Sequence, residues 1–419
     1  MSDVNPCFSE DIWFEILKNL PVKSLGKCRC VCKSWHSLIV SPSFMAAHLK
    51  HYTQNEANSL ILCREISKRS RNEKFEQCIF FRDVLQLKLG NRLHISICPF
   101  VIPRSWLSSG FYFVGSVNGL LCISDNGHVD RILIWNPLIQ KSIKLPKSGS
   151  EGDSMDVGFG YDGRRNDHRV VKISLWPTKM EYLVEVYSVQ ERTWKTICAK
   201  YLVDNSMHPA SGSHCFVNGA IHWRARDKWM LLFNVSEETF AKMALPEELV
   251  NEMSRRRVGD FGLFEYKGKL SVSNCETMSR DLNVSARCQI WVKLDYNVDS
   301  SWYKILFVEM LPKFYSIGTF EYLGDNEELI GFAKEGSREL VSYDHKTKQI
   351  TDLGLYGISD STKFRAFSES LTLIDQKIDD LTADELGRPV DNTPSNRQYL
   401  EYFFGDPMFA LGLDFILDR

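Results

Sequence analysis

The sequence has no long apolar run and no excess of charge of one sign. Of its 419 residues, 51 are lysine or arginine and 53 are aspartate or glutamate, so the formal net charge is −2. A chain without a positive field has no general means of holding nucleic acid or an anionic membrane surface, and we expect neither as a partner. No stretch approaches the ~18 apolar residues of a membrane-spanning helix, and the first residues lack the pattern of a secretory signal. We therefore expect a cytoplasmic and/or nuclear protein.

Catalytic and phosphate-binding motifs are missing as well. The sequence contains no GxSxG, no HExxH and no P-loop. Gly158-x-Gly160 is half of a nucleotide fingerprint, but no helix pattern follows it, so its backbone amides cannot be directed at a phosphate. His222 lies beside Trp223 in a strand pattern and is expected to be a hydrogen-bonded sheet residue. We expect no catalytic residue, no enzyme activity and no cofactor.

Twelve cysteines are spread over a long chain without a secretory signal. This usage favours reduced, mostly buried thiols over a disulfide framework. Cys28, Cys32 and His36 would share one helix face, but residues eight apart on a helix are separated by ~12 Å along its axis. The ligands of one zinc ion each lie ~2.0–2.3 Å from it, so we expect no metal site.

Residues 8–50 have the apolar spacing of short helices. Ile12, Ile16, Leu17 and Leu20 lie on one stripe, and Pro21 ends that helix. Three or four such helices in about 45 residues bury little apolar surface, and they have more apolar positions than one helical hairpin can hide. This unit therefore needs a partner surface.

The segment FSEDIWFEILKNLPVKSLGKCRCVCKSWHSLIVSPSFMAAHL resembles the F-box. The matching features are a Leu-Pro pair, a leucine on the next helix, Val-Cys-Lys-x-Trp, a Leu-Ile pair and the terminal Phe44. The resemblance implies docking into the Skp adaptor and, through it, assembly with cullin and RING subunits of a ubiquitin ligase. The residues expected at the adaptor surface are Ile12, Ile16, Leu17, Leu20, Pro21, Leu25, Val31, Cys32, Trp35, Leu38 and Ile39.

From about residue 58, short β-branched and aromatic runs alternate with turns. Five copies of one unit follow, each with four strands and an aromatic residue in the third. These aromatics are Trp135, Tyr187, Phe233, Trp291 and Tyr343, spaced 46 to 58 residues apart. The first turns read as type I′ hairpins at Asn118-Gly119, Asp162-Gly163, Asn218-Gly219 and Lys267-Gly268.

A four-stranded unit repeated near 50 residues is the signature of a β-propeller blade. Residues 364–375 read as an inner strand without outer strands, and 59–89 as outer strands without an inner one. Joined, they make a sixth blade that closes the ring and removes open edges. We predict a mainly β fold, with a helical F-box at 5–50, a six-bladed propeller at 51–375 and an acidic, partly disordered tail at 376–419. A large β-sandwich is the alternative.

The propeller region also resembles the plant F-box-associated interaction domain, a kelch-like family. The matching motifs are Gly115-Ser116, Asn118-Gly119-Leu120, Trp135-Asn136-Pro137, Gly158-Phe159-Gly160-Tyr161-Asp162, Gly219-Ala220-Ile221-His222-Trp223 and Ser342-Tyr343-Asp344. The resemblance implies a substrate-recognition subunit that binds an unknown client protein through the propeller. Two alternatives remain open: an adaptor-linked propeller that recognises a glycan or small ligand, and a propeller enzyme.

The client is expected on the propeller face with the longer loops, because binding residues concentrate in loops on rigid scaffolds. These loops are 146–154, 198–212, 246–259 and 274–287. Within them Arg255, Arg256 and Arg257 have the densest charge, and arginine forks suit carboxylate or phosphate recognition. We take these three as candidate client contacts.

Overall fold

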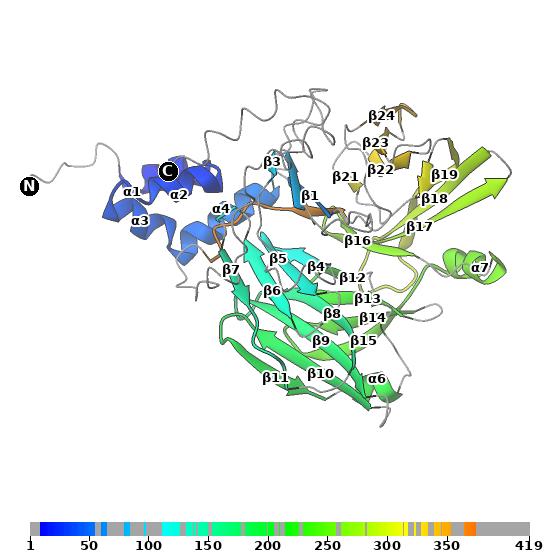
Figure 1. Cartoon of the computed structure of the whole chain (residues 1–419), viewed down its shortest axis with the longest axis horizontal. Coiled ribbons are helices and arrows are strands. Elements are labelled where there is room, and N and C mark those ends of the chain that lie inside the picture. Colours follow the sequence, from blue (N-terminus) through cyan, green and yellow to red (C-terminus); the bar gives the residue numbers. More distant parts are fainter. Residues whose placement is uncertain are drawn as a thin grey trace, which may run out of the picture.

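A computed structural model describes a helical N-terminal unit followed by a series of small sheets (Figure 1). The predicted tail at 376–419 and Arg257 lie outside the described residues. Those residues are 9–54, 60–64, 79–83, 96–97, 111–125, 131–136, 138–139, 141–149, 153–176, 181–198, 200–204, 209, 214–225, 229–256, 261–280, 283–312, 314–316, 322–323, 328–333, 339–344, 346–352 and 364–373.

Four helices make up the N-terminal unit, as the apolar spacing predicts. Leu17, Val22, Leu25, Ile39 and Phe44 are buried together at their centre. Pro21 caps the second helix, where its missing N–H costs nothing. The helices are α1 (Glu10–Lys18), α2 (Val22–Cys28), α3 (Lys33–Ile39) and α4 (Pro42–Gln54).

Six antiparallel sheets follow, and each predicted repeat forms one of them. We call these sheets blades. Blade 1 contains β4 (Phe111–Val117), β5 (Leu120–Asp125), β6 (Ile132–Asn136) and β7 (Lys141–Lys144); blade 2 contains β8 (Asp153–Asp162), β9 (Asp167–Trp176), β10 (Glu181–Ser188) and β11 (Thr193–Ile197); blade 3 contains β12 (His214–Val217), β13 (Ala220–Arg224), β14 (Trp229–Asn234) and β15 (Thr239–Ala244). Blade 4 contains β16 (Gly262–Tyr266), β17 (Lys269–Arg280), β18 (Asn283–Lys293) and β19 (Trp302–Pro312), and blade 5 contains β20 (Phe314–Ser316), β21 (Tyr322–Leu323), β22 (Glu328–Ala333), β23 (Glu339–Asp344) and β24 (Ile350–Asp352).

The sixth blade is built from both ends of the domain, as predicted. Its first strand, β25 (Phe364–Phe367), pairs antiparallel with β1 (Leu60–Arg64). The outer strands are β2 (Ile79–Asp83), within the predicted range 59–89, and β3 (Ser96–Ile97), which lies beyond that range. Pairing of the two ends within one sheet removes an open edge on each. Closure of the whole ring stays a prediction.

The third-strand aromatics of the repeats lie on β6, β10, β14, β18 and β23, and all are buried. Apolar side chains from neighbouring blades pack face to face around them. Ile134 packs with Phe159 between blades 1 and 2, and Ile173 packs with Trp223 between blades 2 and 3. Blades 1 to 4 therefore bury apolar faces against their neighbours, as expected for stacked repeats.

Three of the four predicted type I′ turns are present. Asn118, Asn218 and Lys267 have positive φ, and so do the glycines that follow them. The fourth prediction, at Asp162-Gly163, is wrong. Strands β8 and β9 are joined by four residues, with Asn166 at φ 52°, because the Asp162 carboxylate accepts hydrogen bonds from the amides of Arg164 and Arg165.

Two helices lie in the links between blades, where no helix was predicted. They are α6 (Lys200–Asp204) and α7 (Glu247–Arg256). In α7, Leu249, Val250 and Met253 pack on the core between blades 3 and 4. Pro246 before an acidic first turn was an available signal for its start. None of the described helices is long and apolar enough to cross a bilayer.

The prediction of reduced and mostly buried thiols needs correction. Cys122 is buried, and its low-dielectric surroundings raise the pKa of its thiol. Cys30, Cys32 and Cys198 are exposed. Cys288 is disulfide-bonded, and Cys275 is the residue directly opposite it in the register of β17 and β18.

Candidate functional site

The F-box motif residues divide into an exposed set and a buried set. Leu17, Leu25 and Ile39 are at most 1% exposed and form the core of the four helices. Leu20, Trp35 and Leu38 are half-buried around that core. The residues with exposed side chains are Ile12, Ile16, Pro21, Val31 and Cys32.

Large apolar side chains are exposed at two places in the described part of the chain. One is the F-box, where Ile12 is 44%, Ile16 45% and Val31 67% exposed. The other is blade 4, with Leu294 and Val298 in the β18–β19 turn and Tyr303 on β19. The first of these places coincides with the motif that resembles an adaptor-binding segment.

Ile12 and Ile16 lie one turn apart on α1. Together with Asp11, Glu15 and Asn19 they line a shallow groove. Leu17, the next residue after Ile16, lies about 100° further round α1 and is buried in the core. A helix with apolar side chains on two faces has one face left for a partner.

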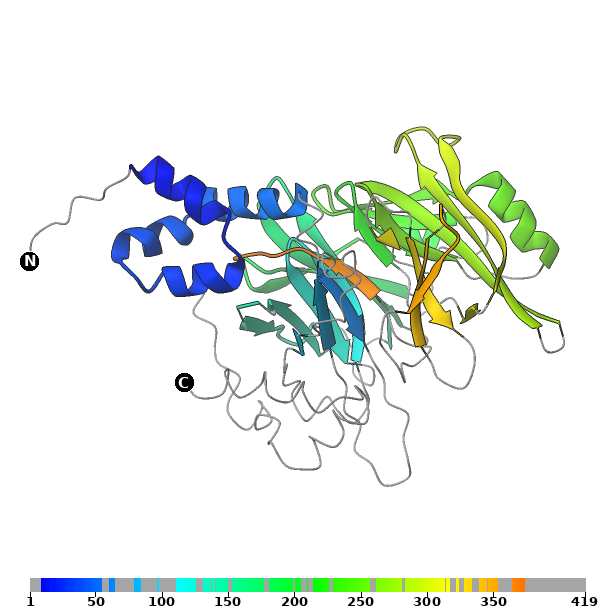
Figure 2. The same cartoon turned by 90° about the horizontal axis from the view of Figure 1, so that it is seen from above.

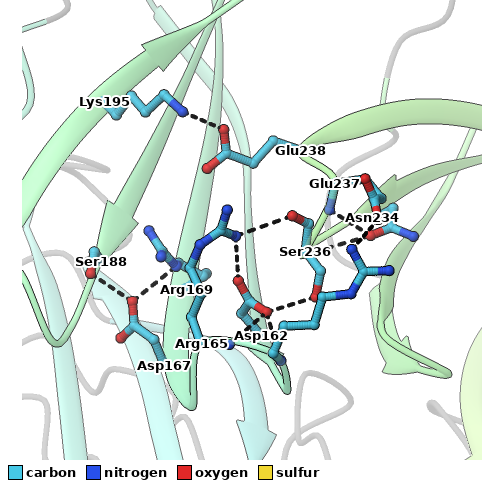
Figure 3. A network of polar contacts seen from close by, with 11 residues as sticks. Asp162, Arg165, Asp167, Arg169, Ser188, Lys195, Asn234, Ser236, Glu237 and Glu238 are labelled. Atoms are coloured by element: carbon cyan, nitrogen blue, oxygen red, sulfur yellow. Dashed lines mark hydrogen bonds and ion pairs between the residues drawn. The ribbon is translucent and has the colours of Figure 1, made fainter.

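A network of polar side chains joins blades 2 and 3 (Figure 3). Arg165 donates to Asp162 at 2.7 Å and to the Ser236 carbonyl at 3.1 Å, and the Ser236 hydroxyl also donates to Asp162. Arg164 pairs with Glu237, and Lys195 pairs with Glu238 at 2.6 Å. Each of these cations thus has a carboxylate partner.

Two buried carboxylates anchor this network. Asp167 accepts from Ser188 at 2.6 Å and pairs with Arg169 at 2.9 Å. Burial acts to raise the pKa of Asp162, but the hydrogen bonds from Ser236 and Arg165 outweigh it and lower that pKa. The lowered pKa keeps Asp162 ionised beside its paired cation, so this carboxylate stabilises the seam between two blades and is poorly suited to proton transfer.

His222, expected above to be a hydrogen-bonded sheet residue, is buried and hydrogen-bonded on both sides. Its Nε2 lies 2.7 Å from the Tyr296 hydroxyl and its Nδ1 lies 3.3 Å from the Cys215 carbonyl. His168 is also buried, with Nε2 3.3 Å from the Val117 carbonyl. Desolvation lowers the pKa of each imidazole to about 4. Both residues are neutral packing groups that connect neighbouring blades.

We predict that the folded chain loses stability as pH falls below 6.5. The unfolded chain binds a proton at each of these histidines near pH 6.5, whereas the folded chain binds it only near pH 4. Stability is therefore complete above pH 6.5 and declines toward pH 4, by about 2 kcal/mol per histidine between pH 7 and pH 5. Urea unfolding at both pH values measures the difference. His222→Gln should reduce it by about that amount, and an unchanged pH dependence would contradict this account.

The candidate client contacts lie at the end of a helix. Arg255 and Arg256 are the last two residues of α7, and Arg257 lies outside the described residues. Helix α7 lies at the far end of the molecule from α1–α4 in both orthogonal views (Figure 1, Figure 2). Its exposed face carries Glu247 and Asn251.

Metal ligation finds no support among the side chains that the structure describes. No group of three or more His, Cys, Asp or Glu residues there has the arrangement of a metal site. Cys30 donates to the Gly26 carbonyl, and the Cys32 sulfur accepts from the Trp35 amide at the start of α3. Both thiols thus form hydrogen bonds with the backbone of their own helical segment.

Comparison with known proteins gives two family matches that cover most of the chain. Residues 6–46 match the F-box domain, and residues 72–377 match the F-box associated beta propeller domain. These two families are typically non-catalytic substrate adaptors.

Similar curated proteins come from Arabidopsis thaliana. A putative F-box protein is 29% identical over 311 residues, which are 70% of this chain and 76% of that protein. An F-box/kelch-repeat protein is 27% identical over 324 residues, 72% of this chain and 79% of its own. The F-box protein CPR1 is 24% identical over 399 residues and spans 87% of this chain and 88% of its own. Among solved structures, a chain of the mitotic checkpoint complex is 9% identical, with a TM-score of 0.35, and covers 62% of this chain and 89% of its own.

Proposed function

Because the chain belongs to the F-box associated beta propeller family, we propose that it is the substrate-recognition subunit of a Skp–cullin–F-box ubiquitin ligase. The F-box binds the Skp adaptor, and the propeller binds a client protein. The complex then holds lysines of the client near a ubiquitin-charged enzyme, so the rate gain comes from proximity. The chain itself performs no covalent chemistry in this proposal.

The exposed apolar face of α1 is the observation that supports binding to the Skp adaptor. Ile12 and Ile16 expose nearly half of their side chains beside a groove, whereas Phe14 and Leu17 of the same helix pack on the F-box core. Burial of a fully exposed isoleucine is worth about 1.5–3 kcal/mol, and covering the exposed part of Ile12 or Ile16 is worth about half of that. We therefore assign the adaptor contact to Ile12, Ile16, Pro21, Val31 and Cys32, and a supporting role to the buried motif residues.

Reconstitution tests this function. The intact chain should be retained on immobilised Skp adaptor and should co-elute with adaptor, cullin and RING subunits in one complex. A chain that is folded, as judged by its cooperative unfolding, but passes through the adaptor column would overturn the proposal.

We place the proposed client-binding surface on the propeller face opposite the tight first turns of the blades. The second turn of each blade and the links between blades lie at that end of the sheets, because consecutive strands are antiparallel. Helix α7 belongs to one of these links and ends in Arg255 and Arg256. A cationic helix end on a rigid blade suits a client segment rich in carboxylate or phosphate.

Reversal of charge at this helix end should weaken client capture. We predict that Arg255→Glu, Arg256→Glu and Arg257→Glu, combined, lower the yield of captured clients without a change in adaptor retention. Clients are identified by affinity capture from plant extract with a variant that cannot bind the adaptor, because its clients escape degradation. Lys346→Glu combined with Lys348→Glu is the control. Both lysines are exposed on the turn between β23 and β24 in blade 5, on the propeller face opposite the proposed client surface. Equal capture by the two variants would remove α7 from the contact.

A further inference from the structure

Residues 367–373, which we call the strap, continue from β25 and lie between the F-box and blade 1. In both views this segment, drawn in orange, runs beside the N-terminal helices (Figure 1, Figure 2). Its side chains divide between the two units. Leu371 is 1% exposed and belongs to the F-box core, whereas Leu373 belongs to the core between blades 1 and 2.

The strap binds the F-box through a helix end. The Val22 amide, the first of α2, donates to the Glu369 carboxylate at 2.8 Å. This bond satisfies a backbone donor that a helix leaves without an internal partner. Burial first, and the Glu369 charge second, raise the pKa of Tyr52 on α4 to about 12. A carboxylate from the end of the propeller thus lies against two helices of the F-box.

The strap binds blade 1 through backbone carbonyls. Asn136, which is fully buried at the end of β6, donates from Nδ2 to the carbonyls of Ser370 and Thr372, both at 2.8 Å. Leu138 and Ile139 follow in the next turn and pack on the F-box core beside Leu371. The F-box, the strap and blade 1 therefore share one continuous interior.

Gly119 makes this close approach possible. A Cβ atom on Gly119 would lie 2.2 Å from Ser370 Cβ and 2.7 Å from the Ser368 carbonyl oxygen. Gly219 occupies the same place in blade 3, with the same left-handed backbone, and a Cβ there would meet nothing within 4 Å. The two turns differ in what lies against them, and only the first faces the strap.

We propose that the strap fixes the orientation of the adaptor-binding face relative to the propeller, with Glu369 and Asn136 as positioning residues. The purpose of this coupling rests on the proposed function, because transfer by proximity requires a constant distance between adaptor and client. The coupling itself rests on the contacts above. In this proposal the F-box is oriented by residues that lie more than 300 positions further along the sequence.

Distance measurements on the full chain test the strap. A pair of spin labels is attached through non-natural amino acids at Lys50 and Glu191, which are exposed on α4 and in the β10–β11 turn, because exposed native cysteines would compete for thiol labels. The unmodified strap should give one narrow distance distribution. Gly119→Ala should broaden it, and the matched Gly219→Ala, which has the same backbone strain, should leave it narrow.

A second pair of variants needs no change in a turn. Glu369→Ala removes the acceptor for the Val22 amide and should broaden the distribution, whereas Glu369→Gln keeps an acceptor oxygen and should restore the narrow one. Retention on the Skp adaptor is measured in parallel and should be unchanged in all four variants. A broad distribution in the unmodified chain, or equal distributions in Gly119→Ala and Gly219→Ala, overturns the strap. Failure of the unmodified chain to bind the adaptor overturns the proposed function. The spin-label distance distributions still test, independently, whether the strap couples the F-box to the propeller.

Discussion

Ile12→Gln combined with Ile16→Gln should abolish retention on the Skp adaptor while the chain stays folded. Both side chains are exposed on α1 beside the groove, so their loss removes apolar surface that only a partner would cover. Truncation of central interface residues costs about 2–4 kcal/mol each, and we expect binding to weaken by at least about 100-fold. Glutamine is a good helix former, so α1 itself should be preserved. Surface plasmon resonance on immobilised adaptor measures the affinity.

Leu294→Gln is the matched control for this double substitution. Leu294 is 53% exposed in blade 4, so the control makes the same kind of change at a similar exposure far from the F-box. Leu17→Ala is the opposite control. It removes a core side chain and should lower thermal stability by about 2–5 kcal/mol. Full adaptor affinity in the double Ile variant would contradict the assigned contact surface.

Gly158→Ala should destabilise the propeller strongly, although it adds one methyl group. The new Cβ would lie 2.4 Å from Trp223 Cζ2 and 2.8 Å from Ile221 Cγ2, and both neighbours are fully buried. Neither can move without disturbing the packing between blades 2 and 3. Overpacking of this kind costs about 1–3 kcal/mol and occasionally more, and we expect the upper end. The midpoint of urea unfolding measures it.

Gly163→Ala provides the comparison for Gly158→Ala. A Cβ at Gly163 meets nothing within 4 Å, so this variant should unfold within about 0.5 kcal/mol of the parent chain. Trp223→Phe removes the ring that contains Cζ2 and should recover part of the loss when it is combined with Gly158→Ala. The two changes should therefore couple in a double-mutant cycle. Equal stability of the two glycine variants would contradict this prediction, because blades 2 and 3 would then accommodate the added methyl group without loss of stability.

The repeat architecture was predictable because its signals are local. An aromatic in each third strand and a type I′ turn in three of the blades are read from a few neighbouring residues, and the structure places all five aromatics as expected. The prediction of a type I′ turn at Asp162 was wrong because the turn geometry depends on which backbone amides donate to the Asp162 carboxylate. Helix α7 was missed because its short apolar stripe was taken as part of a loop.

The F-box motif indicated which segment contains the candidate adaptor contact, but not which of its side chains are exposed. It names Ile16 and Leu17 together, and the sequence gives no reason to separate them, yet one is 45% and the other 1% exposed. The strap was not predictable from any pattern. The Val22 amide and Glu369 are 347 positions apart, and such a contact follows from the assembled fold rather than from spacing.

The strap also has a consequence for the order of synthesis. Helices α1–α4 leave the ribosome before the strap, and Glu369 and Leu371 are made roughly 300 residues later, which takes tens of seconds at ~5–20 residues per second. Until then the Val22 amide of α2 lacks its Glu369 acceptor, and the F-box core lacks Leu371. A nascent chain that has not yet reached residue 371 therefore holds an F-box without one or both of these contacts.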